Sequence, residues 1–359
     1  MEETMREFNY EKLAIQKWDM ETISFIAQIN EYKGRQELYL RQKPVELDRL
    51  IDLAKIQSTE ASNKIEGIVT TETRIKQLVQ EKTTPRNRDE KEIAGYRDVL
   101  NTVHESHAYI PLTPNYIKQL HRDLMQYTDV RMGGQFKNTQ NYIAENHSDG
   151  TVKVLFTPVA PFETEVYVQH ACDAFRIARD KQIVDPLILI SAFLLDFLCI
   201  HPFNDGNGRM SRLLTLLLLY QSGFEVGKYI SVEKHIEKTK EVYYRALWDS
   251  DQRWYEGEND PTPFIKYMLG VIIACYRDFE ERLSFIGDKS SAYDIVSAAL
   301  NIVIGKFSKS DIMNLCPTLS KSSVEGVLRK LIEEGKIQRF GGGRSVYYLK
   351  SDAIMTKLS

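Results

Sequence analysis

The chain has 359 residues with an apolar fraction of 43%, and its 47 basic and 50 acidic residues leave a net charge of −3. This composition excludes a disordered or collagen-like protein and is typical of two or three globular domains. The acidic N-terminus has no apolar stretch, and the longest central apolar run, Pro186 to Leu195, is shorter than the roughly 20 residues of a membrane span, so we expect no signal peptide, no membrane partner and a cytoplasmic protein.

The first part of the chain is predicted to be helical. Between Leu47 and Ile68, apolar residues recur every three or four positions, interrupted only at Ser58, as they do on one face of an amphipathic helix. Gly67 stands where such a helix would end in a left-handed cap.

Two further helices are predicted before the middle of the chain. The first covers 89–107, with Asp89 as its N-cap, and the second covers 113–126, with Thr113 as its N-cap and Pro114 as its first residue. Proline suits that position because it lacks the amide hydrogen that the first helical turn leaves unpaired.

The pattern then changes to a strand. Thr151 to Thr157 is a β-prone run that follows the turn signal Asp149-Gly150. Helical periodicity resumes over 163–179 and again over 186–200. The second of these segments is apolar on all sides, which indicates a buried helix.

The most informative segment runs from His201 to Arg212. Pro202 disfavours a helix beyond His201, and the glycines of Asp205-Gly206-Asn207-Gly208 allow backbone amides to converge. A second apolar helix is expected to begin at about Arg209. The amides of such a loop and of a helix N-terminus together form an anion site.

The charged side chains of this segment support the same interpretation. Arg209 and Arg212 lie three positions apart on one face of the first helical turn, where the helix dipole disfavours cations unless an anion neutralises them. Asp205 offers a carboxylate to Mg²⁺, and His201, with an ordinary pKa of about 6.5, is the proton acceptor beside the loop. The set indicates a polyphosphate site without a Walker loop. A plain turn with surface ion pairs would explain any one of these residues, but not their occurrence together.

The C-terminal segment differs from the rest in charge. From Lys306 onward there are ten basic and five acidic residues, so this segment carries a net charge of +5 and the remainder of the chain −8. A basic module attached to an acidic body indicates a domain boundary and a binding partner.

The same segment has its own order of elements. A short helix over 309–315 is ended by Pro317, and Ser322-Ser-Val-Glu325 is predicted to form a capping box that opens a second helix. A hairpin over 336–340 and 344–349 follows. Helix, turn, helix and β-wing in this order predict a winged-helix module.

The pattern His201-Pro-Phe-x-Asp-Gly-Asn-Gly-Arg-x-x-Arg212 matches the full signature of the Fic family of protein AMP-transferases, and the chain resembles this family from about Thr113 to Trp254. The runs Gly134 to Ile143 and Glu241 to Leu247 are also similar to Fic core elements. The resemblance implies a mainly α fold, with an all-helical Fic core, a small β-hairpin flap and a C-terminal winged helix-turn-helix domain. The implied domains are an N-terminal helical domain (1–112), the catalytic core (113–255), a connecting helix (256–290) and the winged-helix domain (291–359).

The resemblance also implies roles for the residues of the signature. His201 would deprotonate a Ser, Thr or Tyr hydroxyl of a target protein, which then attacks the α-phosphorus of ATP and expels pyrophosphate. Asp205 would hold Mg²⁺, and Phe203 would anchor the loop in the core. The kinase-like Doc branch has lysine where this chain has Gly208, which argues against that branch. Phosphate contacts are implied for the backbone of Gly206, Asn207 and Gly208 and for the side chains of Arg209 and Arg212.

Two contacts with the substrates follow by the same resemblance. Family enzymes hold the target's backbone against a hairpin flap, which the segment 151–157 matches by position, although an ordinary surface hairpin would have the same sequence. Tyr229, Tyr243 and Tyr244 are candidates for the adenine pocket. Aromatic residues at helical spacing belong more often to a core, so this alternative stays open.

A second motif lies upstream. Ser62-Asn-Lys-Ile-Glu66-Gly67 resembles the inhibitory motif S/T-x-x-x-E-G/N of regulated Fic proteins. Ser62 and Glu66 are four apart and share one helical face, and a carboxylate at a helix C-terminus needs a cation to offset the dipole. The resemblance implies that this cation is Arg212. The alternative is a solvated surface glutamate.

Two classes of function are therefore predicted. The first is a protein adenylyltransferase that uses ATP and Mg²⁺ and is inhibited by the pairing of Glu66 with Arg212. The alternative is a DNA-binding regulator whose Fic core senses a nucleotide or removes AMP from modified proteins. The winged helix would bind duplex DNA weakly or contact a protein. Association into a homo-oligomer stays open.

Overall fold

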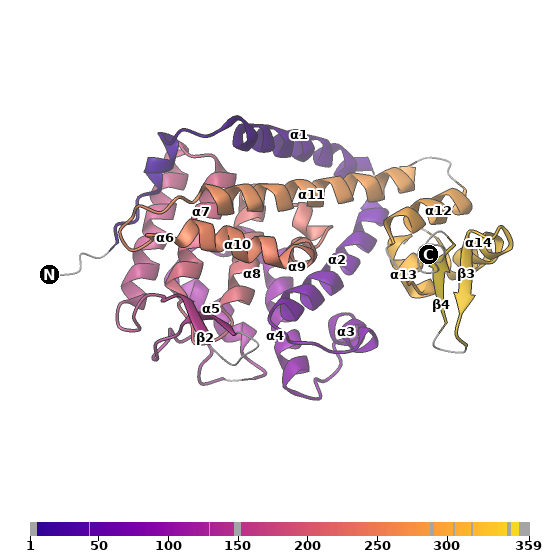
Figure 1. The fold of residues 1–359 in the computed structure, drawn as a ribbon, viewed down its shortest axis with the longest axis horizontal. Coiled ribbons are helices and arrows are strands. Elements are labelled where there is room, and N and C mark those ends of the chain that lie inside the picture. The colour runs from indigo at the N-terminus through magenta and orange to yellow at the C-terminus, as the bar shows by residue number, and fades with distance from the viewer. Residues whose placement is uncertain are drawn as a thin grey trace. The chain divides into compact units, whose positions relative to one another are not determined.

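The computed structural model describes residues 6–42, 44–128, 130–146, 152–287, 291–303, 306–316, 319–342 and 346–351. The fold is mainly helical, as predicted, and two antiparallel sheets of two strands each occur in these residues (Figure 1). The chain divides into two compact units, a core unit of Met1–Leu38 and Ala54–Tyr276 and a C-terminal unit of Tyr39–Leu53 and Arg277–Ser359. The finer division into four domains stays a prediction. None of the described helices has both the length and the apolarity needed to cross a membrane.

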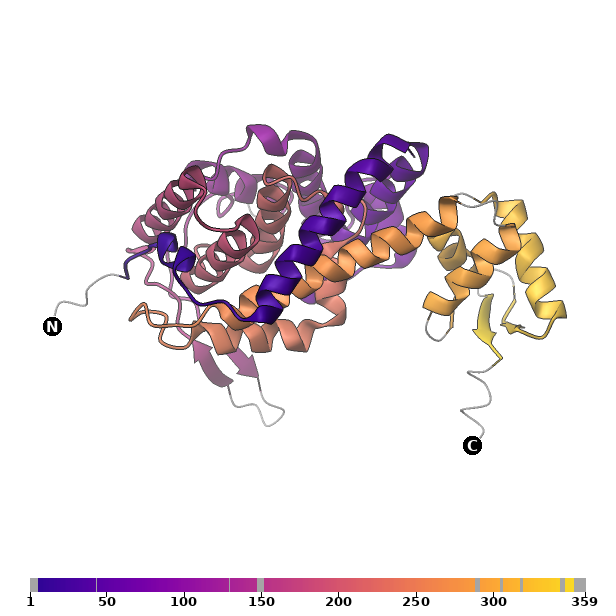
Figure 2. The same ribbon diagram turned by 90° about the horizontal axis from the view of Figure 1, so that it is seen from above.

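Eleven of the described α-helices lie wholly or partly in the core unit. Helix α1 lies across α11 (Figure 2), where Tyr32 stacks on Tyr276 with 5.6 Å between the ring centroids. Short 3₁₀ helices cover Tyr10–Ala14, His107–Tyr109 and Val226–Lys228. The α-helices are, in chain order, α1 (Met20–Gln42), α2 (Pro44–Ile65), α3 (Glu72–Val79), α4 (Arg88–Ser106), α5 (Pro114–Leu124), α6 (Thr164–Lys181), α7 (Pro186–Ile200), α8 (Asn207–Gln221), α9 (Val232–Lys238), α10 (Lys240–Asp251) and α11 (Thr262–Gly287).

Helices α7 and α8 form the centre of the core unit (Figure 1) and present the loop that joins them. Every side chain of α7 from Leu187 to Ile200 is buried, and α7 packs against both α6 and α8. All of α8 except Gly208 and Gln221 is buried as well. Because helices that are apolar on all sides are enclosed by other elements, the loop 201–206 is held between two fixed helix ends.

The ends of these two helices follow from backbone conformation. Helix α7 ends at Ile200, directly before His201 and Pro202, as predicted. Helix α8 begins at Asn207 and not at Arg209, because Gly206 adopts the left-handed conformation, with a φ of 82°, at the N-cap position. The predicted start was therefore two residues late.

Helix caps confirm one prediction and correct another. The Thr113 hydroxyl accepts a hydrogen bond from the amide of Tyr116 at 3.4 Å, so Thr113 caps α5 as predicted. Asp89 is not the N-cap of α4. The side chain of Asn87 accepts from the amide of Glu90 at 2.9 Å, because Asn87 has the extended backbone that an N-cap needs, whereas Asp89 lies in the first helical turn.

The hairpin of the core unit consists of β1 (Ile143–Asn146) and β2 (Val152–Phe156), which pair antiparallel. Strand β2 confirms the predicted strand, while Thr151 and the turn before it lie outside the described residues. The hairpin is tied to the helices by Tyr255, whose hydroxyl donates to the carbonyl of Thr157 at 2.8 Å and whose ring stacks on Phe156.

The C-terminal unit has the predicted winged-helix order. Apart from the ends of α1, α2 and α11 that belong to it, its elements are α12 (Ala292–Ile302), α13 (Lys309–Leu315), α14 (Lys321–Glu333), β3 (Ile337–Phe340) and β4 (Tyr347–Lys350), and β3 pairs antiparallel with β4. Buried apolar side chains from all three helices and both strands form one core, which includes Val296, Ile312, Leu328, Ile337 and Tyr348.

The predicted capping box of α14 is wrong. The N-cap is Ser320, whose hydroxyl accepts from the amide of Ser323 at 3.1 Å, and α14 starts one residue before Ser322. Glu325 instead pairs with Lys309 at 2.5 Å, so its carboxylate is not available to the helix N-terminus. Pro317, the predicted end of the preceding helix, lies outside the described residues.

Candidate active site

His201 ends α7 in a left-handed conformation, with a φ of 51° and a ψ of 62°. A residue other than glycine adopts this conformation only where its surroundings impose it. Nδ1 of His201 lies 3.3 Å from the carbonyl oxygen of Leu198, and because a carbonyl only accepts, Nδ1 carries the hydrogen of the neutral ring and Nε2 keeps its lone pair. Burial lowers the pKa of His201 to about 4, so the ring is neutral at physiological pH.

Two residues that sequence analysis did not identify hold the backbone around His201. Lys137 Nζ donates to the carbonyl of Ile200 at 3.0 Å, and burial lowers the pKa of Lys137 to about 8. Asn141 Nδ2 donates to the carbonyl of Phe203 at 3.0 Å. Both belong to the run Gly134 to Ile143, whose similarity to a Fic core element was the signal that could have identified them.

Phe203 anchors the loop in the core. Its ring is fully buried and stacks on the ring of His121, with 3.7 Å between the centroids. The side chain of Asn207 accepts from the Phe203 amide at 2.8 Å and donates to the Phe203 carbonyl at 2.7 Å. The Asn207 side chain is therefore bonded within the loop, which leaves its backbone amide as the group that can face an anion.

His121 of α5 fixes the other side of the loop, and nothing in the sequence pointed to it. Its Nδ1 accepts from the amide of Gly134 at 3.0 Å, so Nε2 carries the hydrogen and donates to the carbonyl of Asp205 at 3.0 Å. Burial lowers the pKa of His121 to about 4, which keeps the ring neutral and both hydrogen bonds in place.

The N-terminus of α8 is the predicted anion site. Gly206, Asn207 and Gly208 stand there, and the first amide hydrogens of a helix have no acceptor within it. A methyl group on Gly208 would lie 2.2 Å from Oε1 of Glu66, so any larger residue there would make the Glu66 side chain shift.

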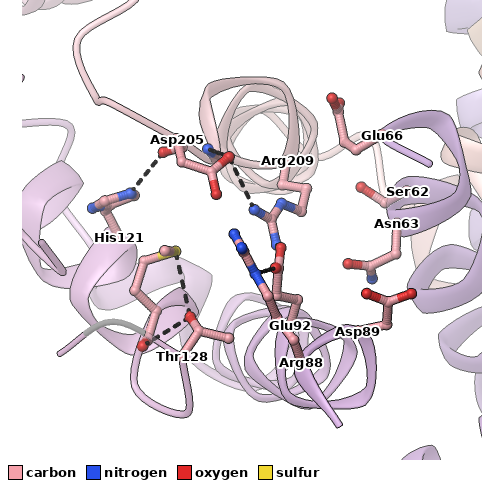
Figure 3. Close-up of polar contacts among 12 residues, drawn as sticks. Ser62, Asn63, Glu66, Arg88, Asp89, Glu92, His121, Thr128, Asp205 and Arg209 are labelled. Carbon is pink, nitrogen blue, oxygen red and sulfur yellow. Dashed lines mark hydrogen bonds and ion pairs between the residues drawn. The ribbon is translucent and has the colours of Figure 1, made fainter. Parts of the chain in front are cut away.

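Arg209 lies at the start of α8 between two carboxylates (Figure 3). Its Nη1 is 2.8 Å from Oε2 of Glu92 on α4, and its Nη2 is 3.4 Å from Oδ1 of Asp205. The side chain is 1% exposed, and neither Nε nor Nη1 has a hydrogen-bond partner among the described residues, so the contact of Nη1 with Glu92 is an ion pair without hydrogen-bond geometry. The anion that a cation needs at a helix N-terminus is thus supplied by Glu92, which the sequence did not reveal.

Asp205, the predicted Mg²⁺ ligand, has a side chain that is 54% exposed. Its Oδ1 accepts from the amide of Gly206 at 2.6 Å. The described residues contain no cluster of three or more His, Cys, Asp or Glu side chains that would hold a metal alone. A single accessible carboxylate fits Mg²⁺ whose remaining ligands are phosphate oxygens and water.

Arg212 lies one turn further along α8 and faces α2. Its Nη2 is 2.8 Å from Oε1 of Glu66, and its Nε donates to the hydroxyl of Ser62 at 2.8 Å. Nη2 also donates to the carbonyl of Ser62 at 2.9 Å. The structure therefore brings together the two motifs, which lie far apart in the sequence. Gly67 ends α2 with a φ of 81°, as predicted.

The three candidate adenine-pocket tyrosines lie in different surroundings. Tyr243 is buried against Phe264 and Tyr267, and burial raises its pKa well above the ordinary value. Tyr229 is buried as well, whereas Tyr244 is 44% exposed. Tyr244 thus has the accessibility that a nucleotide contact needs, and the other two have positions typical of a core.

A model of the Fic/DOC family matches residues 111–219. Protein adenylyltransferase Fic from Nematostella vectensis is 25% identical over 227 residues, which are 62% of this chain and 48% of that protein. Protein adenylyltransferase fic-1 from Caenorhabditis elegans is 28% identical over 154 residues, which are 42% of this chain and 25% of that protein. The chain spans half or less of the length of these relatives.

Solved structures with a similar fold include a Fic family protein from Desulfovibrio desulfuricans G20, with a TM-score of 0.63 and 21% identity over 93% of this chain and 97% of that one. Residues 134–508 of Fic-1 from Caenorhabditis elegans have a TM-score of 0.56 and 19% identity, covering 73% of each chain. At these identities the likeness concerns the fold.

Proposed function

The chain belongs to the Fic/DOC family, and on this premise we propose that it is a protein adenylyltransferase, which transfers AMP from ATP to a Ser, Thr or Tyr hydroxyl of a target protein and releases pyrophosphate. The observation that carries the proposal is a half-buried, neutral His201 directly before the amides at the N-terminus of α8 and the arginines that follow them. A base beside an anion site is what this transfer requires.

His201 acts as the general base. Because Nδ1 is bonded to Leu198, the hydroxyl proton goes to Nε2. As this proton moves, a bond forms from the hydroxyl oxygen to the α-phosphorus, and the bond from the α-phosphorus to the bridging oxygen of pyrophosphate breaks with its electron pair. Bound phosphates place negative charge beside the ring, which raises its pKa above the value in the free protein and makes it a stronger base.

The N-terminus of α8 holds the phosphates. Amides at Asn207 and Gly208 donate to phosphate oxygens, the amide of Gly206 joins them when it leaves Oδ1 of Asp205, and Arg212 pairs with the γ-phosphate. Arg209, held by Glu92, adds positive charge behind the β-phosphate. Phosphoryl transfer depends on positioning and charge neutralisation, so these groups lower the barrier without forming a covalent bond.

Mg²⁺ is the implied cofactor, and Asp205 is the residue that would hold it. When bound, Mg²⁺ neutralises phosphate oxygens next to the bond that breaks. The fixed backbone of Asp205, bonded to His121, keeps the carboxylate directed to one position.

Glu66 inhibits the enzyme in this proposal. Its carboxylate forms an ion pair with Arg212, and it lies so close to Gly208 that it fills the space over the first turn of α8. ATP could then not place its γ-phosphate on Arg212, and its α-phosphorus would be displaced from His201. A misplacement of about 1 Å costs on the order of a hundredfold in rate. Glu66 is 33% exposed, so water can receive it when it leaves.

The target protein docks on the β1–β2 hairpin. Strand β2 pairs only with β1 within the described residues, so its other edge can accept the extended backbone of a target. Such pairing holds the backbone of the target by main-chain hydrogen bonds and leaves the target's Ser, Thr or Tyr side chain free to reach His201.

The transfer of label from α-phosphate-labelled ATP to protein, with Mg²⁺ present, tests the proposal. In a Glu66→Gly background, His201→Ala should reduce labelling by about 10²- to 10⁴-fold while ATP still binds. His170→Ala, which changes an exposed histidine of α6, is the matched control. Unchanged labelling by the His201→Ala protein would show that the assigned chemistry is wrong.

The C-terminal unit supports the second candidate, a DNA-binding regulator whose Fic core senses a nucleotide or removes AMP. Helix α14 buries Val324 and Leu328 and exposes Lys321, Arg329 and Lys330, as a groove-reading helix would. A gel-shift titration at low salt tests this, with complexes that weaken steeply as salt is added. Absence of a complex with any duplex would leave protein contact as the role of this unit.

A further inference from the structure

A buried chain of hydroxyl groups begins behind Arg212. Ser62 has no exposed surface, and its oxygen accepts from Nε of Arg212 at 2.8 Å. Burial raises the pKa of Tyr96 well above its ordinary value, and a hydrogen bond from Ser62 opposes that increase. The hydroxyl of Tyr96 in turn donates to Oε1 of Glu233 at 2.9 Å. Hydrogen bonds thus join Arg212 to Ser62 and Tyr96 to Glu233, and the effect of Ser62 on the pKa of Tyr96 connects the two pairs.

Glu233 at the end of this chain is fully buried in the first turn of α9. Its second oxygen, Oε2, accepts from the hydroxyl of Ser58 at 2.6 Å and from that of Ser231 at 3.2 Å. No lysine or arginine forms an ion pair with it in the described part of the chain. Because a buried carboxylate is costly unless it is compensated, the cation at the far end of the hydroxyl chain, Arg212, is the charge that offsets Glu233.

We propose that Glu233 is a positioning residue which, through Tyr96 and Ser62, holds the guanidinium of Arg212 in place when Glu66 leaves and the γ-phosphate of ATP enters. The inference rests on the proposed function, because it assigns a phosphate to Arg212. Nε and Nη2 of the guanidinium both donate to Ser62, Nη2 also contacts Glu66, and Nη1 lies beside Gly208. Departure of Glu66 therefore leaves both bonds to Ser62 in place.

One face of α2 provides both the residues that connect Glu233 with Arg212 and the carboxylate that blocks Arg212. Ser58 and Ser62 on α2 and Glu66 directly after its last residue follow one another at intervals of four, so they lie on one side of that helix. Ser58 and Ser62 are fully buried at the two ends of the hydroxyl chain, and Glu66 at the helix end is part exposed. Ser58, which interrupts the apolar pattern in the sequence, is there to donate to Glu233.

Calorimetric binding of ATP and of AMP, each with Mg²⁺, to a Glu66→Gly protein tests the proposal. Glu233→Gln and Tyr96→Phe, each added to that protein, should weaken ATP binding by about tenfold, the loss expected for one displaced charge-assisted hydrogen bond. AMP binding should not change, because AMP has no γ-phosphate for Arg212. In a Glu66→Gly/Arg212→Ala protein neither substitution should weaken ATP binding further.

Two matched controls separate this role from general damage to the core. Tyr276→Phe removes a buried hydroxyl that has no hydrogen-bond partner among the described residues, and Glu90→Gln neutralises a buried carboxylate paired with Arg74. Both should leave ATP binding unchanged. Equal losses of ATP and AMP binding, no loss at all, or a loss that persists without Arg212 would each overturn the proposal.

A second measurement keeps the inference distinct from the proposed function. Glu233→Gln should lower the urea midpoint of the wild-type protein, and it should lower that of an Arg212→Ala protein less, because the compensating charge is already gone. If the Glu66→Gly protein binds no ATP, the proposed function fails, and this coupling alone then decides whether Glu233 holds Arg212. Equal midpoint shifts in the two backgrounds would overturn the inference even where ATP binds.

Discussion

Helix α8 begins between two arginine–carboxylate pairs that have the same distance and different exposure. Nη1 of Arg209 lies 2.8 Å from Glu92, and these side chains are 1% and 6% exposed. Nη2 of Arg212 lies 2.8 Å from Glu66, whose side chain is 33% exposed. A carboxylate that leaves its partner must be solvated, and only Glu66 has water beside it. The first pair is therefore fixed in the fold, and the second pair can open for a ligand.

The largest effect that would sharpen this comparison is on stability. Glu92→Ala leaves the buried charge of Arg209 with only Asp205 at 3.4 Å, so it should lower the free energy of unfolding by about 3–5 kcal/mol. Glu66→Ala should cost less than Glu92→Ala, because the Glu66 carboxylate is part exposed and the buried Arg212 keeps both of its bonds to Ser62. Urea denaturation at neutral pH measures both. Equal costs would show that exposure does not distinguish the two pairs.

The next effect is on activity, where changing Glu66 should have the larger effect and changing Glu92 the smaller one. Glu66→Gly should raise self-labelling from ATP by on the order of a hundredfold, because the γ-phosphate can then align on Arg212. Glu92→Gln removes the same charge from the other arginine and should give no increase. Labelling is compared at matched concentrations of folded protein. A folded Glu66→Gly protein no faster than the wild type would contradict the inhibitory role and leave that of His201 intact.

Local sequence signals predicted the backbone of the site well. Pro202 after an apolar run set the end of α7, and Thr113 with Pro114 set the start of α5, because both act within one helical turn. The capping predictions that failed, at Asp89 and at Ser322, each missed a better cap two residues earlier. The choice among neighbouring polar residues depends on the backbone conformation of the chain entering the helix.

The partners of the charged side chains could not be predicted in the same way. Glu92 and Glu233 come from α4 and α9, and nothing near them in the sequence connects them with Arg209 or Arg212. Such pairs follow from the packing of whole helices, which composition and periodicity do not determine. The contact of Glu66 with Arg212 could be predicted only because each of these residues lies in a motif of the Fic family.

A smaller effect on labelling from ATP is expected from Gly208→Ala. The added methyl group would lie 2.2 Å from Oε1 of Glu66 and 3.3 Å from Nη1 of Arg212, so the carboxylate must move away from the arginine. The methyl group also narrows the anion site. The gain in labelling that Glu66→Gly produces should therefore be smaller in a Gly208→Ala protein than in the wild type. An undiminished gain would mean that Glu66 and residue 208 do not compete for the same space.

The smallest effect concerns the ionisation of His201. Burial lowers its pKa to about 4, and the charge of Glu66 opposes this, whereas Glu92 is not among the groups that affect it. Glu66→Gly should therefore lower the pKa of His201 further, and Glu92→Gln should leave it unchanged.

NMR titration of the ring, assigned with the His201→Ala protein, measures this shift, and the chain unfolded in urea provides the reference at about 6.5. Because the folded pKa lies below the unfolded one, the unfolded state binds more protons as the pH falls from about 6.5 to about 4, and stability falls over that range. The buried His104 and His121 contribute in the same direction, with pKa values lowered to about 3 and about 4. Folding must therefore be followed by circular dichroism at each pH. A folded protein in which His201 titrates near its unfolded value would show that the ring is solvated, and it would contradict the assignment of His201 as a base that the fold keeps neutral.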